Sequence, residues 1–325
     1  MIANKVREVV DPTKIIKITR KGNLHISGCY VDWPFRLSLL YQLPLQFGLK
    51  IILDQFTKNK IANPSNYKEE LLNLYGPTLY YAFFDPLTRK HTKTDPKYIH
   101  SEWAFSSIRA ATKIEDKSFK DTYSYSTEGT DDVAKEDFNI FRFLAKTLLS
   151  NNNNEPFYYF ENGYGTLVES YQEKIKSLGG TIVTKSTISE FEMDKNVVKK
   201  CIINDKAYDV DKVVWTASPY FLCQLLKLEA PSLEYMNSKF VYFLLRRCKK
   251  DFQTCYYPDP NIMFNRAAIF SNHSKSIIHN KEVSDVLGVE YTFKTMEEMK
   301  KNPEEQIKQA IKDMISVGII DDESA

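Results

Sequence analysis

The pattern of apolar residues predicts a mixed α/β (α+β) fold that includes an antiparallel sheet. Three observations support it. Apolar residues recur at helical spacing between residues 67 and 149. A glycine turn at residues 163–165 opens an amphipathic helix that Gly179 and Gly180 end, and short strand-like pieces follow. Several β-rich pieces then recur between residues 239 and 293, before a last helix.

The composition is that of a globular protein with little net charge. The 325 residues, 43% of them hydrophobic, suffice for one large domain or two interlocked ones. The 44 basic and 42 acidic residues leave a net charge of +2, so nothing favours nucleic acid or acidic membranes as partners. Twenty Tyr and twenty Phe suit flat surfaces around planar ligands, but a general bias toward Tyr, Phe, Asn and Lys is the favoured explanation.

Cysteine and histidine spacing argues against metal sites and disulfides. The five cysteines form no C-x-x-C pair, and the five histidines form no H-E-x-x-H motif. The N-terminus lacks the apolar segment of a secretory signal, and no apolar run approaches the roughly 20 residues of a spanning helix. We therefore expect a cytoplasmic protein with no metal, no nucleic-acid partner and no membrane span.

Residues 1–66 are expected to form an entry hairpin and a connecting segment. Alternating residues 14–18 and residues 24–26 flank a turn at Gly22, which predicts a β-hairpin. A helical pattern follows Trp33 and breaks at Pro44.

Residues 67–150 are expected to form a helical cap. The first helix should stop at Gly76–Pro77, and helical spacing resumes until Pro86. Further helices are predicted over residues 102–111 and 137–149, with a polar loop over 112–136 between them.

Residues 155–222 show the clearest local signal. An aromatic run, Phe157 to Phe160, leads into the turn that contains Gly163 and Gly165. Thr166 and Glu169 have the spacing of a capping box, which marks the start of a helix. Strands are predicted after this helix over residues 181–184, 188–192, 197–203, 207–210 and 213–216.

Residues 223–325 should form an antiparallel sheet and a terminal helix. The predicted strands cover residues 240–245, 263–270 and 286–293. Pro303 has the position of a first helical residue, and Gly318 ends the helix.

Four blocks together carry a resemblance to a known family. In chain order they are Leu74–Lys90 with Trp103 and Arg109, Asn162–Gly180, Asp211–Pro219, and Tyr256–Asn272. The second contains Asn162-Gly163-Tyr164-Gly165-Thr166-Leu167, similar to a Gly-Gly-x-Gly-x-Leu turn. In order and spacing, the blocks resemble flavoproteins of the amine oxidase type, which include protoporphyrinogen-oxidase-like proteins and UDP-galactopyranose mutase.

The resemblance implies a partial FAD/NAD(P)-binding Rossmann-like domain over residues 155–222, with an antiparallel substrate-domain sheet and a helical cap. It implies an FAD-dependent oxidoreductase acting on a small-molecule substrate. A flavin-dependent nucleotide-sugar mutase is an alternative on the same fold. A non-catalytic remnant that binds a partner or small ligand is another.

The resemblance also implies site residues, although it names no catalytic residue. Those expected to border FAD are Gly163, Gly165, Ile188, Thr216, Ala217 and Pro219. Tyr256, Asn265 and Arg266 would face the substrate, because an Arg fork suits a carboxylate or phosphate. The alternatives are turn and core roles for the first group and a surface salt bridge for Arg266.

One expected feature of the family is missing. The family begins with a strand, a G-x-G-x-x-G turn and a helix, and that turn brings backbone N–H groups to the FAD pyrophosphate. Before residue 70 the only glycines are Gly22, Gly28 and Gly48, which lack this spacing. The sequence also ends at Ala325, where the family usually continues over the flavin. We therefore expect a truncated, split or decaying member of the family, whose missing βαβ unit would come from a second chain or from a longer natural product.

Overall fold

The computed structural model describes residues 2–33, 35, 38–104 and 156–321. The predicted loop over residues 112–136, the helix over 137–149 and most of the helix over 102–111 lie outside these residues. The chain divides into two compact units. We call Pro12–Thr166 with Met236–Ala325 the sheet unit, and Met1–Asp11 with Leu167–Tyr235 the meander unit.

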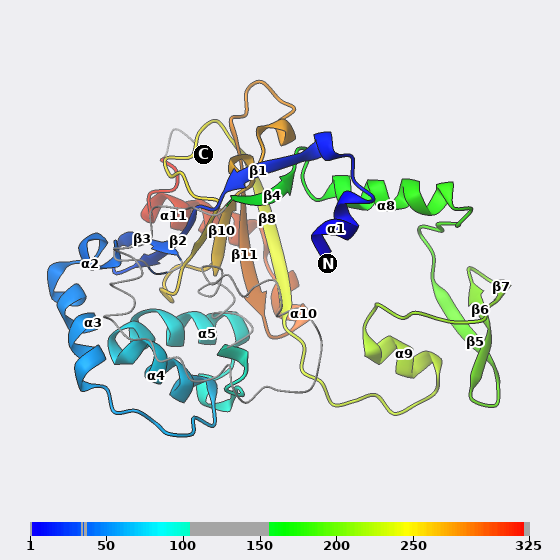
Figure 1. Ribbon diagram of the computed structural model, residues 1–325, viewed down its shortest axis with the longest axis horizontal. Helices are drawn as coiled ribbons and strands as arrows, with labels where there is room; N and C mark the ends of the chain where they lie inside the picture. Colours follow the sequence, from blue (N-terminus) through cyan, green and yellow to red (C-terminus); the bar gives the residue numbers. More distant parts are fainter. Residues whose placement is uncertain (1, 34, 36–37, 105–155, 322–325) are drawn as a thin grey trace. The chain divides into compact units, whose positions relative to one another are not determined.

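The sheet unit contains a six-stranded sheet in the order β3-β2-β9-β10-β11-β8 (Figure 1). Its strands are β2 (Gly22–Ile26), β3 (Cys29–Trp33), β8 (Asn237–Leu245), β9 (Thr254–Tyr256), β10 (Arg266–Ile269) and β11 (Asp285–Phe293). All neighbours are antiparallel except β2 and β9. The antiparallel sheet predicted for the C-terminal region is confirmed, and the mixed α/β class with it.

The predicted pairing of the two N-terminal strands in one hairpin is wrong. β1 (Ile15–Thr19) pairs with β4 (Pro156–Phe160) in a separate two-stranded sheet, and β2 forms the hairpin with β3 instead. Ser27 and Gly28, both with positive φ, make the tight turn of that hairpin. The local pattern at Gly22 thus signalled a change of direction between strands, but strand pairing was decided by residues far along the chain.

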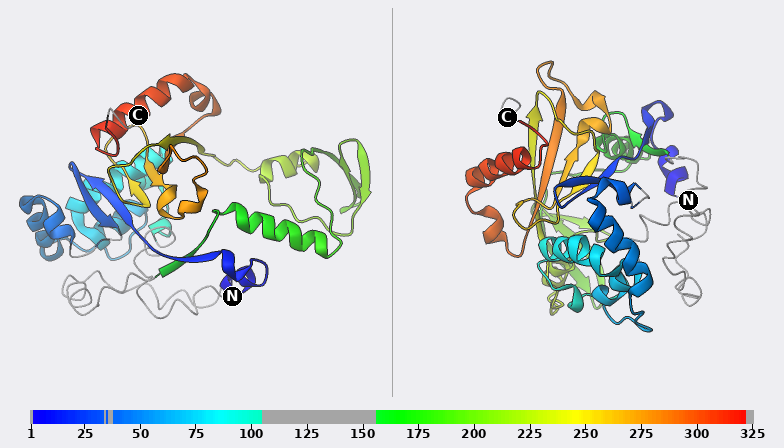
Figure 2. Two further views of the ribbon diagram at one scale, coloured as in Figure 1. Left: turned by 90° about the horizontal axis from the view of Figure 1, so that it is seen from above. Right: turned by 90° about the vertical axis from the view of Figure 1, so that its left-hand side faces the viewer.

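Helices cover the two faces of the six-stranded sheet (Figure 2). On one face, α11 (Pro303–Ser316) places Ala310 and Met314 against Leu287 and Val289 of β11 in one apolar core. On the other face, Leu24 and Val31 of the β2–β3 hairpin pack with the helical cap in a second core. From here on, the helical cap means the helices on this face, two of which precede residue 67: α2 (Leu39–Gln42), α3 (Leu45–Thr57), α4 (Tyr67–Leu79), a π-helical turn (Tyr80–Phe84) and α5 (Asp85–Thr92).

The break predicted at Gly76–Pro77 is present as a kink inside α4. Gly76 has φ 79° and ψ 169°, a conformation essentially restricted to glycine. The buried carboxylate of Asp54 accepts a hydrogen bond from the Thr78 amide at 2.6 Å, which satisfies a donor freed by the kink. α3 and α4 are therefore joined at the point where the backbone leaves helical geometry.

The meander unit has little core of its own. It contains α1 (Ile2–Arg7), most of α8 (Gly165–Ser177), the antiparallel strands β5 (Ile188–Asp194), β6 (Val197–Ile203) and β7 (Lys206–Asp209), and α9 (Pro219–Leu225). Between Leu167 and Tyr235 only Phe191 and Cys201 are buried hydrophobic residues. The three meander strands confirm their predictions.

Two predicted strands of this unit, residues 181–184 and 213–216, are not strands in the structure. Among the described residues, no backbone–backbone hydrogen bond joins either segment to another part of the chain. A strand exists only when a neighbour pairs with it, so a correct apolar pattern is not sufficient.

No described helix is long and apolar enough to cross a membrane. Among the same residues, no group of three or more His, Cys, Asp or Glu side chains is placed to hold a metal ion.

Candidate functional site

A row of side chains crosses the sheet on the face that the helical cap covers in part. Phe240, Glu290, Arg266 and Tyr256 are register partners on β8, β11, β10 and β9. Cross-strand partners project to the same face of a sheet, so these four lie side by side. Tyr256 packs against the core of the cap, whereas Phe240, on the edge strand, remains exposed.

Arg266 is held by an ion pair on this face. Its Nη2 lies 2.7 Å from Oε2 of Glu290, and the Glu290 side chain is only 9% exposed. The guanidinium also lies over the Phe240 ring, 5.8 Å from its centroid. The salt bridge considered as an alternative for Arg266 is therefore present, and an anionic ligand at Arg266 would compete with Glu290.

His91 of α5 lies in the electrostatic field of this pair. Its ring is exposed at the surface, yet desolvation by surrounding protein lowers its pKa, while Glu290 raises it and Arg266 lowers it. The neutral imidazole is thus favoured near pH 7, in a form that can both donate and accept a hydrogen bond. No motif in the sequence singles out His91, because the effect of Glu290 on its pKa depends on packing between α5 and β11.

Asn265 is buried rather than open to a ligand. Its Nδ2 donates to Thr292 Oγ1 at 2.9 Å, and Thr292 in turn donates to the Lys90 carbonyl at 2.9 Å. Asn265 therefore helps to connect the sheet to α5. Its Oδ1 is buried and has no hydrogen-bond partner among the described residues.

Lys90 fastens α5 to the loop after β9. Its Nζ donates to the carbonyl oxygens of Tyr257 at 2.8 Å and Asp259 at 2.9 Å. Desolvation lowers the pKa of Lys90 to about 7, an effect that Asp259 and Asp313 oppose. Burial of an amine with two neutral acceptors explains this direction, because neutral carbonyls do not fully replace the water around a charge.

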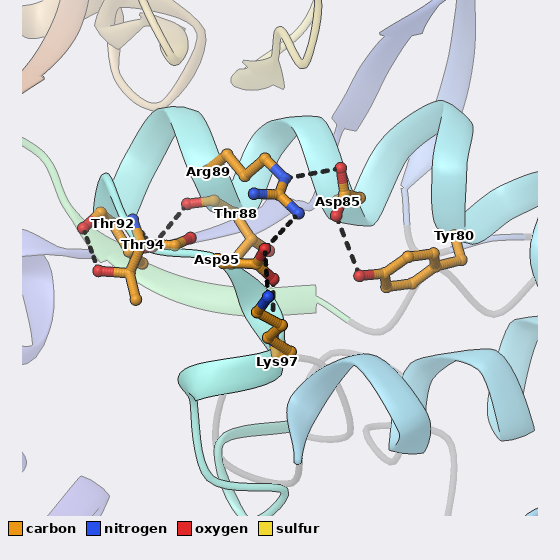
Figure 3. Close-up of polar contacts among 8 residues, drawn as sticks. All are labelled: Tyr80, Asp85, Thr88, Arg89, Thr92, Thr94, Asp95 and Lys97. Atoms are coloured by element: carbon orange, nitrogen blue, oxygen red, sulfur yellow. Dashed lines mark hydrogen bonds and ion pairs between the residues drawn. The ribbon is translucent and has the colours of Figure 1, made fainter.

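Arg89 also holds α5, through ion pairs with two aspartates (Figure 3). Its Nε lies 2.9 Å from Asp85 and its Nη2 lies 3.0 Å from Asp95, so one guanidinium joins the start of α5 to the loop after it. Tyr80 donates a further hydrogen bond to Asp85 at 3.1 Å. Arg89 and Lys90 thus position α5, and through it His91.

The glycine turn predicted to approach the cofactor lies between β4 and α8. Gly163 has φ 80°, which favours glycine. A Cβ atom at Gly163 would meet only Ile277, at 3.9 Å, and one at Gly165 would meet nothing within 4 Å. The turn therefore has open space around both glycines, and their expected role beside a flavin nucleotide stays a prediction.

The turn packs against the segment that follows β10. Ser274 Oγ donates to the Glu161 carbonyl, and the ring of Tyr159 lies 5.0 Å from that of His273. Burial lowers the pKa of His273, and its Nδ1 has no partner among the described residues. The aromatic strand and glycine turn are thus part of the sheet unit.

Aromatic contacts connect this turn to the row on the sheet. The ring of Phe240 stacks on that of Tyr242, with their centroids 6.2 Å apart. The Tyr242 ring lies 5.6 Å from that of Phe270, which in turn lies 6.2 Å from the ring of His273. Gly288 makes this arrangement possible, since a Cβ there would approach the Phe270 ring to 2.7 Å. We call Phe240, Tyr242, Phe270, His273 and Tyr159 the aromatic series.

The other residues expected to border FAD belong to the meander unit. Ile188 begins β5, Thr216 and Ala217 precede α9, and Pro219 is its first residue. Trp215 donates from Nε1 to the Ser218 carbonyl at 3.0 Å and contacts Phe191 of β5 at 6.3 Å. The segment before α9 therefore lies beside β5 in this unit, while Gly163 and Gly165 lie in the sheet unit.

Comparisons with known proteins identify the fold. No protein-family model matches the chain, and no curated protein sequence matches it. Among solved structures, reduced UDP-galactopyranose mutase matches with a TM-score of 0.74 at 15% identity, over 100% of this chain and 67% of that one. An oxidoreductase from Methanosarcina mazei matches with a TM-score of 0.60 at 13% identity, over 98% of this chain and 69% of that one. The chain thus shares its fold with these enzymes.

Proposed function

We propose that this chain carries the substrate-facing part of an FAD-dependent oxidoreductase of the amine oxidase or protoporphyrinogen-oxidase-like type. One observation carries the proposal: within one unit, the aromatic series runs from the Gly163–Gly165 turn to the row around Arg266. A cofactor at the turn and a substrate over the sheet would share this apolar surface.

Bound flavin would supply the hydride chemistry. The chain's own residues would bind and orient the cofactor and the substrate. Gly163 and Gly165 leave room for the cofactor, the exposed rings of Phe240 and Tyr242 offer a flat apolar surface, and Arg266 with Glu290 fixes one end of the substrate. His91, neutral near pH 7 and in the electrostatic field of the pair, would accept a proton released during the reaction.

A nucleotide-sugar mutase is the second candidate, because the mutase gives the higher structural similarity of the two enzymes above. In a nucleotide sugar, the phosphate would bind Arg266, and the base would lie against the exposed rings of Phe240 and Tyr242. For this, Arg266 would have to leave its ion pair with Glu290. A non-catalytic binding module remains the third, since no sequence motif for the pyrophosphate is present.

FAD binding tests the proposal. The purified chain, incubated with excess FAD and freed of unbound ligand by gel filtration, should keep flavin absorbance. Gly163→Ala should weaken FAD binding at least about tenfold, because a side chain would occupy the space above the turn. Gly179→Ala is the matched control, as Gly179 also has a φ near +80° and no atom within 4 Å of an added Cβ.

A wild-type chain that stays colourless in excess FAD would contradict the proposal. So would equal loss of FAD in the two variants, because strain at a positive φ would then explain both. A change of absorbance on adding a nucleotide sugar, without consumption of an oxidant, would favour the mutase instead.

A further inference from the structure

We propose that two copies of this chain associate as a symmetric dimer through the outward face of α3. The apolar residues of that face are Leu45, Leu49, Leu53 and Phe56, and Tyr41 of α2 precedes them. We call these five residues the outer stripe. The inference goes beyond the flavin function proposed above and does not depend on it.

α3 is apolar on two opposite faces. On the inner face Gly48, Ile51 and Asp54 are buried, and Ile51 belongs to the core of the cap. The outer stripe recurs every three or four residues, and at about 100° per residue it lies opposite the buried face. A surface helix normally carries polar residues there, whereas a helix that is apolar all round is one that is covered on both sides.

The outer stripe is exposed in the single chain, at the outer edge of the cap in Figure 1. The exposed fractions are 79% for Tyr41, 73% for Leu45, 50% for Leu49, 57% for Leu53 and 63% for Phe56. At roughly 200 Å² for a fully exposed large side chain, these fractions correspond to on the order of 600 Å² of apolar surface. A patch of this size on a monomer usually marks an interaction site.

The size and pattern of the outer stripe favour a second copy as its occupant. A stable interface takes about 800 Å² from each partner, so the stripe supplies most of one side of a dimer. In a two-fold dimer the same patch serves both partners and must therefore complement itself. Large apolar side chains spaced three or four residues apart meet this condition, because they interlock with the same row on a second helix.

The charges of α3 are compatible with self-association. Its only acidic residue, Asp54, is buried on the inner face, and its only basic residue, Lys50, is exposed beside the stripe. Two copies would thus bring neutral side chains together and leave one lysine each at the rim, where its amine stays in water. A single lysine offers little attraction to an acidic partner.

Sedimentation equilibrium of the whole purified chain, without FAD, tests the proposal. The mass should rise from that of one chain toward that of two as the protein concentration increases. Leu53→Glu should raise the dissociation constant of the dimer at least about a hundredfold, because a symmetric interface carries the new charge twice.

Leu233→Glu is the control, since Leu233 is 52% exposed but belongs to the meander unit. It should leave the dissociation constant unchanged. Circular dichroism and urea unfolding check that both variants fold. A second measurement avoids the new charge: a short bismaleimide should crosslink two copies of Leu53→Cys more efficiently than two copies of Leu233→Cys or of the wild type.

A monomer at every concentration would overturn the proposal, and so would a mass that grows beyond two chains. Equal weakening by the two glutamate variants would also contradict it, because general apolar association would then explain both. Binding of a monomeric wild type to phosphatidylserine vesicles, lost in Leu53→Glu and in high salt, would assign the stripe to a lipid surface instead. A dimer of a chain that never binds FAD would uphold the interface and contradict the proposed function.

Discussion

Lys90 illustrates how a single residue couples the cap to the sheet. Its amine reaches two carbonyls of the loop after β9, and its own carbonyl accepts from Thr292 of β11. Three contacts at one residue thus fix the C-terminal half of α5, next to His91. The lowered pKa of Lys90 makes this connection dependent on pH.

The sign of that dependence follows from proton binding. With a pKa of about 7 in the folded chain and an ordinary value near 10.5 when unfolded, the unfolded state binds more protons between these limits. The contribution of Lys90 to stability should therefore rise as pH increases from 7 to 10. Lys90→Met should cost about 1–3 kcal/mol at pH 9.5, because two carbonyls lose their donor, and less at pH 6.5.

Urea unfolding of both proteins at the two pH values measures this difference. Lys50→Met, at an exposed position of α3, controls for loss of a charge. A cost for Lys90→Met that stays constant or shrinks as pH rises would show that the amine is charged in the folded chain throughout this range.

At the scale of elements, the cap depends on the kink in α4. The kink turns the helix at Gly76, and Asp54 from α3 accepts from the backbone just after it. The following π-helical turn then supplies Phe83 and Phe84, which pack with Trp33 and Phe35 in the cap core. The glycine at this position therefore sets the direction of the rest of α4, the π-helical turn and α5.

Gly76→Ala should destabilise the sheet unit by at least about 2 kcal/mol. The new Cβ would require a backbone conformation that alanine rarely adopts, and it would approach Asp54 Cβ to 2.7 Å. Gly28→Ala is the matched control, since Gly28 has φ 77° but no atom within 4 Å of an added Cβ. Equal losses in thermal or urea unfolding would mean that the contact with Asp54 contributes nothing.

At the scale of the whole molecule, burial is unequal between the two units. The sheet unit has two cores, one on each face of its sheet, whereas the part of the meander unit between Leu167 and Tyr235 buries only two hydrophobic residues, Phe191 and Cys201. Apolar burial is the main source of folding free energy, so the two units should differ in stability.

We expect the isolated chain to unfold in two steps, the meander unit first, and to form oligomers or aggregates through its exposed apolar surface. Trp215 lies in the meander unit, and Trp33 and Trp103 lie in the sheet unit. The difference in fluorescence between wild type and Trp215→Phe therefore reports the first step. A single transition, identical by fluorescence and circular dichroism, in a monodisperse monomer would contradict this prediction.

The sequence by itself determined the features that depend on neighbouring residues. Local patterns located the kink at Gly76, the turn at Gly163, the meander strands, the C-terminal strands and the last helix, because turn chemistry and apolar period act over a few residues. Only the tertiary structure decided which strands pair, that Arg266 is neutralised by Glu290, that both act on the pKa of His91, and that residues 181–184 and 213–216 form no backbone ladder with other described residues. Pairing, ion pairs and burial join residues far apart in the chain, so they depend on which surfaces meet, and no local pattern contains that information.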